Sequence, residues 1–487
     1  MNRRSYLKAI GATVVGGSII GGTALQLADD GSDGPGEPPS EQPTAVHTPD
    51  GPGETATSEG TPQQESCELS HRGIPFDCAI DAVDDLGMDP TGSVPVDDQI
   101  SFQHGALIDF PPGTYLFEKS HVVEHLKNWG VRGLGSDPSE VRFVAPPRAI
   151  LRLFNIRSGK NVLMENITFD QRETRQGSLG SVVRVSDGLQ MYNLKHTGFE
   201  PSQTTGTVSL LHPIVTDPKG TGIIDGYEVK MGYEHAPYPK NGISFWAGPP
   251  HKGTLTLRNV YIENLPGLYM SRTDGDVHVE NCHFRNNDIS AIRVCGEGSY
   301  VKNTKIEIDT DNSYNVVGKH DHNQGIRWES GFKGKTGGYI ENVDIVCKSV
   351  NRSSGLVKVE GSAGALTIRD TSIRCDPDKV PIVTSTPPGA TRAIDGKPSK
   401  PWNVNIDGLS VTGKSSAGDP AIRLYGRDNS VVRNSCIDIQ GERNGILVQD
   451  ANSCLIENTN IWVPGEYIVL KNATADTKGI THSKQCQ

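Results

Sequence analysis

The densest group of side chains that could do chemistry lies between residues 269 and 329. Asp288 and Glu329 offer two carboxyl groups there, and Arg293 and Arg327 offer two positive charges. A glycosidase that inverts needs a protonated carboxyl group and a carboxylate on either side of the scissile bond. A polysaccharide lyase instead needs a base beside a cation that neutralises the carboxylate of the sugar. We therefore take Asp288 and Glu329 as candidate catalytic acid and base, with both reactions open.

A column of outward side chains is expected to carry the arginines. Tyr269, Arg293 and Arg327 each follow a small residue and an apolar residue in a recurring strand motif, so all three face solvent. A guanidinium group forks onto a carboxylate, and an aromatic face stacks on a sugar ring. We therefore expect Tyr269, Arg293 and Arg327 to bind an acidic polysaccharide. The full expected column is Ser244, Tyr269, Arg293, Arg327, Val357, Arg423 and Leu447. The acids that could instead neutralise the arginines are Asp288, Glu297 and Glu329, and that alternative stays open.

A loop at 309–324 should form one wall of this groove, because Arg293 and Arg327 are farther apart in sequence than Tyr269 and Arg293. The loop carries His322, which we add to the candidate substrate-binding residues. The run His320-Asp321-His322 could also hold a metal ion, but alternating residues in a loop more often do not. We assign no metal ligand and keep Ca²⁺ only as a possible cofactor.

These side chains need a scaffold that stacks equivalent segments, and a repeat in the sequence supplies one. An apolar residue, any residue, Asn, any two residues and a second apolar residue recur nine times from about 161 to 463. From residue 259 onward the repeats are 22 to 39 residues apart. The repeat centres are Asn166, Asn259, Asn281, Asn303, Asn342, Asp370, Gly408, Asn434 and Asn458.

The repeat predicts an all-β fold of stacked coils. Alternating apolar residues indicate short strands, and Asn tolerates the left-handed conformation of a sharp bend. Its amide can also bond the amide one coil away. A repeat of about this length corresponds to one coil of three short strands, and stacked coils bury a continuous core. We predict a single-stranded parallel β-helix of about 10–12 coils, with an outward column of alternating charge beside the Asn positions.

The region before the repeats resembles a known family. Residues 79–86 have helical apolar spacing and could cap the open end of the core. The run FPPGTYL at 110–116 and the run VRGLGS at 131–136 are typical of the N-terminal region of the pectin-lyase-like superfamily. This resemblance covers about residues 77–470 and implies a right-handed parallel β-helix with an N-terminal capping region.

A second, partial resemblance concerns the reaction. The run GIRWESG at 325–331 is similar to the substrate-binding coil of polygalacturonase-type glycoside hydrolases. Arg327 matches the arginine of that coil, whereas Glu329 stands where the family has Lys. Asp288 is the counterpart of one of the family's adjacent aspartates, and the family's Gly-His-Gly motif is absent. The resemblance implies hydrolysis of an acidic polysaccharide.

Composition and charge exclude several classes of protein. The 487 residues include 55 Gly and 31 Pro, hydrophobic residues make up 35%, and the mean hydropathy is −0.42. These values rule out a polytopic membrane protein and disfavour long helices. The formal net charge is −11, of which residues 67–487 carry −5. Without a basic block, we expect no nucleic-acid partner.

The N-terminus indicates export. Arg3 and Arg4, followed by Tyr6, Leu7 and Lys8, resemble a twin-arginine signal, and a Gly-rich apolar stretch without charges follows up to residue 28. An uncleaved segment would instead be a single membrane anchor. Residues 29–66 carry nine acids and no Lys or Arg, which predicts a disordered acidic linker. The remaining division is an N-terminal cap with first strands at 67–150, the β-helix at 151–470 and a tail at 471–487.

All nine cysteines lie after residue 66, in the part expected to be exported, where disulfides persist. Cys347 and Cys375 each follow a repeat centre by five residues. We therefore predict that they are stacked neighbours in consecutive coils, bonded if oxidised. Cys67 and Cys78 form a second candidate pair.

Two functions from different classes fit these features. The first is an exported, extracellular or cell-surface enzyme, a hydrolase or lyase, that acts on an acidic polysaccharide in a groove along the β-helix. The second is a non-catalytic surface β-helix that binds glycan or serves adhesion. In both cases the partner is a glycan, the expected state is monomeric, and a membrane is contacted only through an uncleaved N-terminal segment.

The paired arginines are the specific element of the export signal, so Arg3→Lys with Arg4→Lys should leave the protein inside the cell. Cell fractionation and immunoblotting of the two forms would measure this. Undiminished secretion of the double variant would contradict the twin-arginine assignment.

Overall fold

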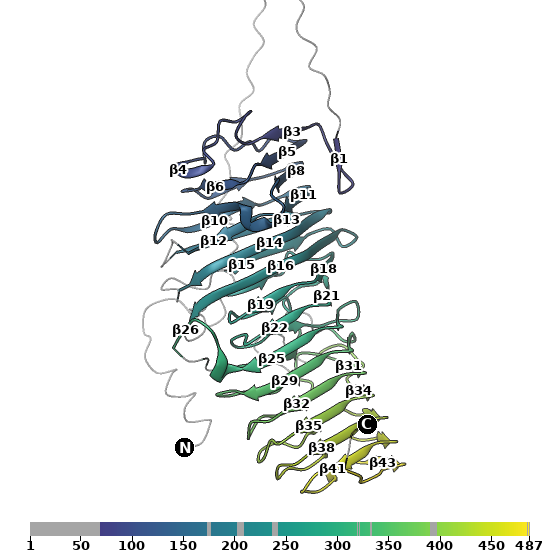
Figure 1. Ribbon diagram of the computed structural model, residues 1–487. Coiled ribbons are helices and arrows are strands. Elements are labelled where there is room, and N and C mark those ends of the chain that lie inside the picture. The colour runs from purple at the N-terminus through teal and green to yellow at the C-terminus, as the bar shows by residue number, and fades with distance from the viewer. Residues whose placement is uncertain are drawn as a thin grey trace, which may run out of the picture. The chain divides into compact units, whose positions relative to one another are not determined.

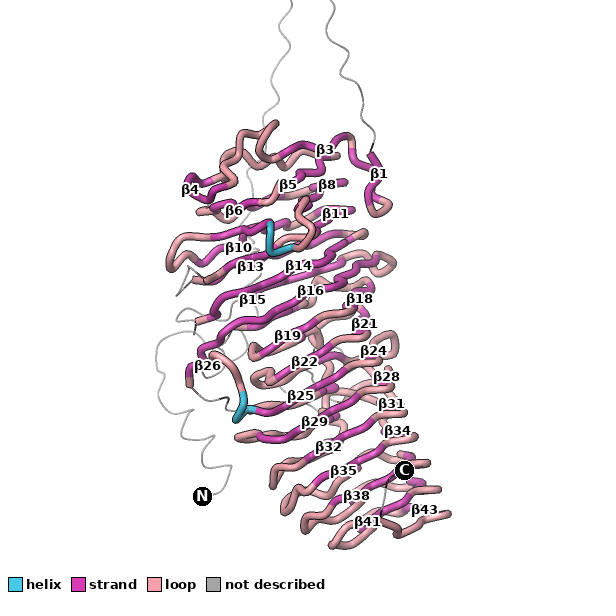
Figure 2. The backbone as a smooth tube through the Cα atoms, viewed as in Figure 1, coloured by secondary structure: helices cyan, strands magenta, loops and turns pink. Residues whose placement is uncertain are grey.

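The strands of this chain stack as successive coils of a parallel β-helix (Figure 1). The computed structural model describes residues 69–487 except 173–176, 202–208, 236–241, 319, 321, 332–333, 390–396, 485 and 487. Figure 2 shows strands alternating with loops, and helix in this part of the chain is limited to the short 3-10 segments η1 (Pro138–Glu140) and η2 (Thr310–Asn312). The predicted all-β parallel β-helix is therefore confirmed.

The first face of the helix is a sheet in which every described neighbour pair is parallel. It has 13 strands among the described residues, slightly more than the 10–12 coils expected. Its strands are β7 (His121–Val123), β10 (Ile150–Ile156), β13 (Ser178–Val185), β15 (Ser209–Val215), β17 (Ile243–Trp246), β20 (Leu268–Tyr269), β23 (Ile292–Val294), β27 (Ile326–Trp328), β30 (Val357–Val359), β33 (Val383–Ser385), β36 (Ile422–Tyr425), β39 (Ile446–Gln449) and β42 (Ile468–Lys471).

The second face is formed by the strands that precede the Asn corners. Its strands are β3 (Cys78–Asp81), β5 (Ala106–Phe110), β8 (Leu126–Gly133), β11 (Gly159–Glu165), β14 (Leu189–Glu200), β16 (Thr221–Glu234), β18 (Thr254–Arg258), β21 (Asp276–Glu280), β24 (Tyr300–Lys302), β28 (Tyr339–Glu341), β31 (Leu366–Arg369), β34 (Val404–Asp407), β37 (Val431–Arg433), β40 (Cys454–Glu457) and β43 (Ala475–Lys478). The long strands β14 and β16 continue around the corner onto the third face, where they pair with β12 and β19.

The third face follows each Asn corner. Its other strands are β4 (Thr91–Pro95), β6 (Gly113–Leu116), β9 (Val141–Val144), β12 (Thr168–Asp170), β19 (Tyr261–Glu263), β22 (His283–Arg285), β25 (Lys305–Asp309), β29 (Asp344–Ser349), β32 (Ser372–Cys375), β35 (Ser410–Gly413), β38 (Cys436–Ile439) and β41 (Asn460–Trp462). A two-residue strand, β26 (Val316–Val317), pairs with the end of β16, and an antiparallel hairpin of β1 (Leu69–His71) and β2 (Ile74–Phe76) precedes the coils.

The nine repeats stack in the register that the sequence predicts. Ile262, Phe284 and Ile306 are direct neighbours on β19, β22 and β25, and each is almost completely buried. All nine centres have positive φ, for example 50° at Asn342 and 72° at Gly408. The Nδ2 of Asn342 donates to the Oδ1 of Asn303 one coil away, at 2.8 Å. Both the bend and the amide ladder are thus confirmed.

The charged column beside the Asn corners is also present. Arg258, Glu280, Lys302, Glu341 and Arg369 are successive partners on the second face. Lys302 lies 3.0 Å from Glu341, and Arg369 is also paired with Glu341. Because the sign alternates, each charge is balanced by its neighbour along the column.

The N-terminal region differs from its expected form. Residues 79–86 do not form a capping helix: Ala79, Ile80 and Asp81 belong to β3, which pairs with β5. The carboxylate of Asp81 accepts from the N–H groups of Val83 and Asp84, so a turn follows the strand directly. The coils therefore begin at residue 78, not at 151, and β42 and β43 extend them past residue 470.

The cysteines are only partly as expected. Cys347 and Cys375 are direct partners on β29 and β32, which confirms the stacking, and both are free thiols in this structure. Their oxidation to a disulfide stays a prediction, as does the Cys67–Cys78 pair, because Cys67 lies outside the described residues. The disulfide that the structure does form joins Cys436 on β38 to Cys486, whose Cα atoms are 5.4 Å apart. It ties the C-terminal segment back onto the coils.

We expect Asn342→Val to lower the free energy of unfolding by about 2–3 kcal/mol, because it combines left-handed strain with a lost hydrogen bond. Asn342→Gly keeps the bend and loses only the hydrogen bond, at a cost of about 1 kcal/mol. Urea unfolding followed by circular dichroism measures both. Equal losses in the two variants would show that the left-handed bend is not what the corner requires.

Candidate functional site

An outward column crosses the first face at β17, β20, β23, β27 and β30. Trp246 is the register partner of Tyr269, Tyr269 of Arg293, Arg293 of Arg327, and Arg327 of Lys358. We call these five residues the aromatic–cation column. Three of them, Tyr269, Arg293 and Arg327, are the predicted substrate-binding residues, and the structure stacks them as expected.

Two members of the expected column were wrong. Ser244 does not precede Tyr269 in the column, because Phe245 pairs with Leu268 on the buried side and places Trp246 beside Tyr269. Val357 pairs with the buried Ile326, so Lys358 takes the outward position next to Arg327. Both errors have one cause. The number of residues between the small residue of the motif and the buried apolar residue varies from strand to strand, so counting from the small residue does not always give the outward position.

The aromatic end of the column is covered, and the cationic end is open. Trp246 packs against His212, with ring centroids 4.1 Å apart and the rings tilted by 46°, and is only 7% exposed. The guanidinium carbon of Arg293 lies 3.9 Å from the centre of the Tyr269 ring, and burial raises the pKa of Tyr269 to about 12. The side chain of Arg327, in contrast, is 28% exposed. A ligand would therefore meet mainly the Arg327 guanidinium group, because the Arg293 side chain is only 11% exposed.

Glu329 lies between the two arginines. Its Oε2 is 2.6 Å from the Nε of Arg327, its Oε1 is 3.6 Å from the Nη1 of Arg293, and the Oγ of Ser271 donates to it at 3.0 Å. Burial acts to raise its pKa, but Arg293, Arg327 and the bond from Ser271 hold the pKa below its usual value. Glu329 is therefore ionised and holds the two arginines in place; its catalytic role stays a prediction.

A second carboxylate, Glu360, balances the other side. It lies 3.1 Å from the Nη2 of Arg327 and 3.0 Å from the Nζ of Lys358. The cluster thus contains three cations, Arg293, Arg327 and Lys358, and two carboxylates. One positive charge remains unbalanced within it.

A buried arginine holds the backbone at Glu360. Arg427 is completely buried, and its Nη2 donates to the carbonyl of Glu360 at 2.8 Å. Its other nitrogens donate to the carbonyls of Thr386, Ala363 and Gly364 at 2.8–2.9 Å. Burial lowers its pKa to about 10, so the guanidinium stays charged at neutral pH. Arg427 therefore fixes the loops beside the column.

Asp288, the other predicted catalytic residue, has a different set of partners. Its Oδ2 is 2.8 Å from the Nδ1 of His235 and accepts from the hydroxyl of Tyr233 at 3.2 Å, while its Oδ1 is 3.7 Å from the Nδ1 of His320. The side chain is completely buried. Burial acts to raise its pKa, but the two histidines hold the pKa below its usual value. Asp288 is therefore an ionised carboxylate that orients the imidazole of His235.

The two groups are connected through the segment that follows Asp288. Ile289 has a φ of 62°, a left-handed conformation that is strained for a β-branched side chain, and its N–H donates to the carbonyl of His322 at 2.5 Å. The next residue, Ser290, accepts a 2.7 Å hydrogen bond from the Nε of Arg293. His322 thus lies beside this segment through its main chain, and its role in binding stays a prediction.

Among the described residues, no three His, Cys, Asp or Glu side chains gather as a metal ion would require. Asp321 of the run His320-Asp321-His322 lies outside that part of the chain, so the structure says nothing of this run as a unit. In the same described ranges, no helix has the length and hydrophobicity needed to cross a bilayer.

Sequence reasoning missed four site residues: Trp246, Lys358, Glu360 and His235. Trp246, Lys358 and Glu360 lie just after strand motifs of the first face. Their positions could have been found by aligning the buried apolar residue of each strand with that of the next strand. His235 lies in the long interval between Asn166 and Asn259, where no repeat is recognisable, and only the fold brings it to Asp288.

Comparison with known proteins gives distant structural similarities. No family model and no curated protein matches the chain. The chain is similar to the catalytic domain of a GH87 alpha-1,3-glucanase in complex with nigerose, at 15% identity and a TM-score of 0.36, over 77% of this chain and 61% of that one. It is also similar to the Streptococcus pneumoniae surface protein and adhesin PfbA (13%, TM-score 0.43, 82% and 100%) and to the Azotobacter vinelandii mannuronan C-5 epimerase AlgE6 A-module (13%, 0.42, 84% and 100%). Values this low transfer neither ligand nor activity. The strand topology itself is that of a parallel β-helix.

We expect Glu329→Gln to lower the free energy of unfolding by about 3 kcal/mol, because it leaves two partly buried guanidinium groups without their shared anion. Since folding lowers the pKa of Glu329, its contribution is complete above about pH 4.3 and is lost as the pH falls toward the folded pKa. Urea unfolding at neutral and acid pH measures both effects. The exposed Glu466→Gln is the control, and equal losses in the two variants would contradict the assignment.

Proposed function

We propose that this chain binds an acidic polysaccharide at the cationic end of the aromatic–cation column and cleaves it by β-elimination. The observation that carries the proposal is the in-register stack of Arg293, Arg327 and Lys358 on three consecutive coils. Neighbouring coils are about 4.8 Å apart, so three like charges stand side by side. A polymer that carries carboxylates would supply the anions that this stack lacks.

The unbalanced positive charge of the cluster would attract an acidic ligand. Guanidinium groups form bidentate hydrogen bonds with carboxylates, and these are stronger than neutral hydrogen bonds. Arg293 is held by Ser290 and by the Tyr269 ring, and Arg327 is held by two carboxylates, so neither must be ordered when a ligand binds. Preorganised cations of this kind favour an acidic sugar over a neutral one.

Elimination fits the charge states better than hydrolysis. A hydrolase needs one protonated carboxyl group, but Asp288 and Glu329 both have lowered pKa values. In an elimination, a base removes the proton next to the sugar carboxylate, the electron pair forms a C=C bond, and the glycosidic oxygen leaves and takes up a proton. We assign the base to His235 oriented by Asp288, because imidazole changes its charge near neutral pH. Arg293 and Arg327 would neutralise the carboxylate.

Non-catalytic glycan binding is the second candidate, and a specific observation favours it. The Asp288 side chain has no exposed surface, and Glu329 is neutralised by its arginines. Neither carboxylate is presented to a ligand, as adhesion alone would allow. In either case we propose an exported, extracellular or cell-surface protein, which the twin-arginine motif and the Cys436–Cys486 disulfide support.

The test is to incubate the protein with a panel of uronate polymers and to follow the ultraviolet absorbance of unsaturated products together with new reducing ends. We expect His235→Gln to reduce the rate by at least about 100-fold while retention on the immobilised polymer persists. We expect Arg293→Ala with Arg327→Ala to lose retention. The control is His283→Gln, which removes an imidazole paired with Glu307 at 2.7 Å on the third face.

Circular dichroism confirms the fold of each variant. If the parent binds acidic polymers but releases no product, the non-catalytic function holds and the elimination is wrong. If the folded arginine double variant binds acidic polymers as tightly as the parent, the column is not the binding site.

A further inference from the structure

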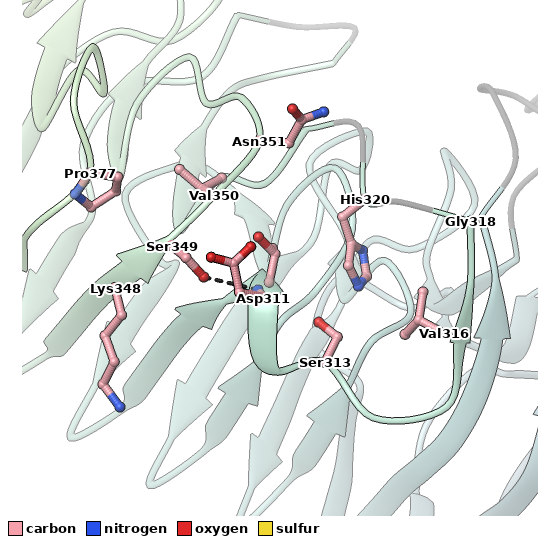
Figure 3. A pocket seen from close by; sticks show the side chains of 11 residues that line it. Asp311, Ser313, Val316, Gly318, His320, Lys348, Ser349, Val350, Asn351 and Pro377 are labelled. Carbon is pink, nitrogen blue, oxygen red and sulfur yellow. Dashed lines mark hydrogen bonds between the residues drawn. The ribbon is translucent and has the colours of Figure 1, made fainter.

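A cavity of about 660 Å³ lies where the 309–324 loop meets the turn of the next coil (Figure 3). One wall comes from the loop, with Asp311, Ser313 and His320, and the other from residues 348–351 of the following coil. None of the column residues lines it. The cavity is therefore a site separate from the aromatic–cation column.

The walls of this cavity are fixed by contacts within the fold. β26 of the loop pairs with the end of β16, which attaches the loop as an additional strand. The N–H of Asp311 donates to the Oγ of Ser349 at 2.9 Å, and that hydroxyl bonds the Oδ1 of Asp309 at 3.0 Å. These hydrogen bonds link the two walls of the cavity. The cavity is therefore already formed without a ligand.

His320 is the feature that points to a ligand. It is only 3% exposed, and among the residues that the structure describes neither of its ring nitrogens has a hydrogen-bond partner. Figure 3 shows its ring directed into the cavity from the loop. Buried polar groups are nearly always hydrogen-bonded, because an unsatisfied one costs about 1–3 kcal/mol. A ligand in the cavity would supply the partner that the protein does not.

The charge of the lining selects against anions. Asp311 and Lys348 line the cavity, and Asp309, just outside the lining, lies 3.7 Å from the ammonium group of Lys348. The carboxylates of Asp309 and Asp311 therefore outnumber the Lys348 ammonium group by one. A phosphate or a uronate would be repelled here, in contrast to the column, and a compact divalent ion lacks the ligand cluster it needs among the described residues.

The remaining groups match a sugar. Ser313 and Asn351 offer a hydroxyl and an amide group, each of which donates and accepts, and the Asp311 carboxylate accepts. Cavities of roughly 300–1,000 Å³ hold small ligands. We propose that this cavity binds one neutral sugar residue, either free or as a branch of a polymer, with His320 and Asp311 hydrogen-bonded to its hydroxyl groups.

This proposal goes beyond the function proposed for the column and does not depend on it. The experiment is to titrate the protein with neutral monosaccharides, such as glucose, galactose, mannose and N-acetylglucosamine, and with glucuronate as the charged comparison. Saturation-transfer NMR and calorimetry give the affinities. A second arm uses neutral polymers with and without single-sugar branches.

We expect at least one neutral sugar to bind and glucuronate to fail. Asp311→Ala and His320→Gln should each weaken binding at least about tenfold, because each removes a hydrogen-bond partner. Asp344→Ala, an exposed carboxylate on β29 outside the cavity, is the matched control and should bind like the parent. Arg293→Ala with Arg327→Ala should also leave this binding intact, which separates the cavity from the column.

Binding confined to the branched polymer, and lost in Asp311→Ala, would support the proposal and identify the branch as the source. The proposal is overturned if neither arm binds a neutral sugar, or if Asp311→Ala and Ser313→Ala, checked as folded by circular dichroism, bind as tightly as the parent.

Discussion

The in-register stacking of parallel strands is the constraint on which the rest of this structure depends. Each residue lies about 4.8 Å from its equivalent in the next coil, so any residue type that repeats becomes a continuous ladder. Inside the coils this produces an apolar stack such as Ile262, Phe284 and Ile306. At the corners it produces the Asn ladder, in which Asn342 bonds Asn303. Stability and function therefore both arise from which side chains are repeated.

Charged ladders show this constraint most clearly, because neighbouring like charges repel. At an effective dielectric constant of 20, two unit charges one coil apart interact by about 3 kcal/mol. The second face avoids the cost by alternating sign, as in Glu280, Lys302 and Glu341. The first face does not alternate, and there Glu329 and Glu360 balance the cations from the loops beside the column. Retaining adjacent cations in this way is costly for stability alone, which is why we connect the column to a ligand.

Most of the fold could be predicted from the sequence, because the repeat reports the stacking directly. The Asn centres, the buried neighbours and the Cys347–Cys375 register all follow from one spacing. The prediction was wrong where the spacing has no bearing: residues 79–86 have helical periodicity but lie at the first coil, where pairing with β5 outweighs local preference. The Cys436–Cys486 disulfide joins positions that are not equivalent, so no repeat could indicate it.

The site could be predicted only in part, for a related reason. Tyr269, Arg293, Arg327 and Glu329 belong to regular coils, and the structure brings them together as expected. The partners of Asp288 come instead from irregular segments, whose path the repeat does not describe.

The 309–324 loop affects two neighbouring features, the cavity and the surroundings of Asp288. It places His320 between the cavity and Asp288, with 3.7 Å from its Nδ1 to the carboxylate. The same carboxylate bonds His235, and the strained Ile289 that follows leads to Ser290 and the Nε of Arg293. The one loop therefore lines the cavity and also contributes to the surroundings of the carboxylate that orients His235, although no hydrogen bond is seen between His320 and Asp288.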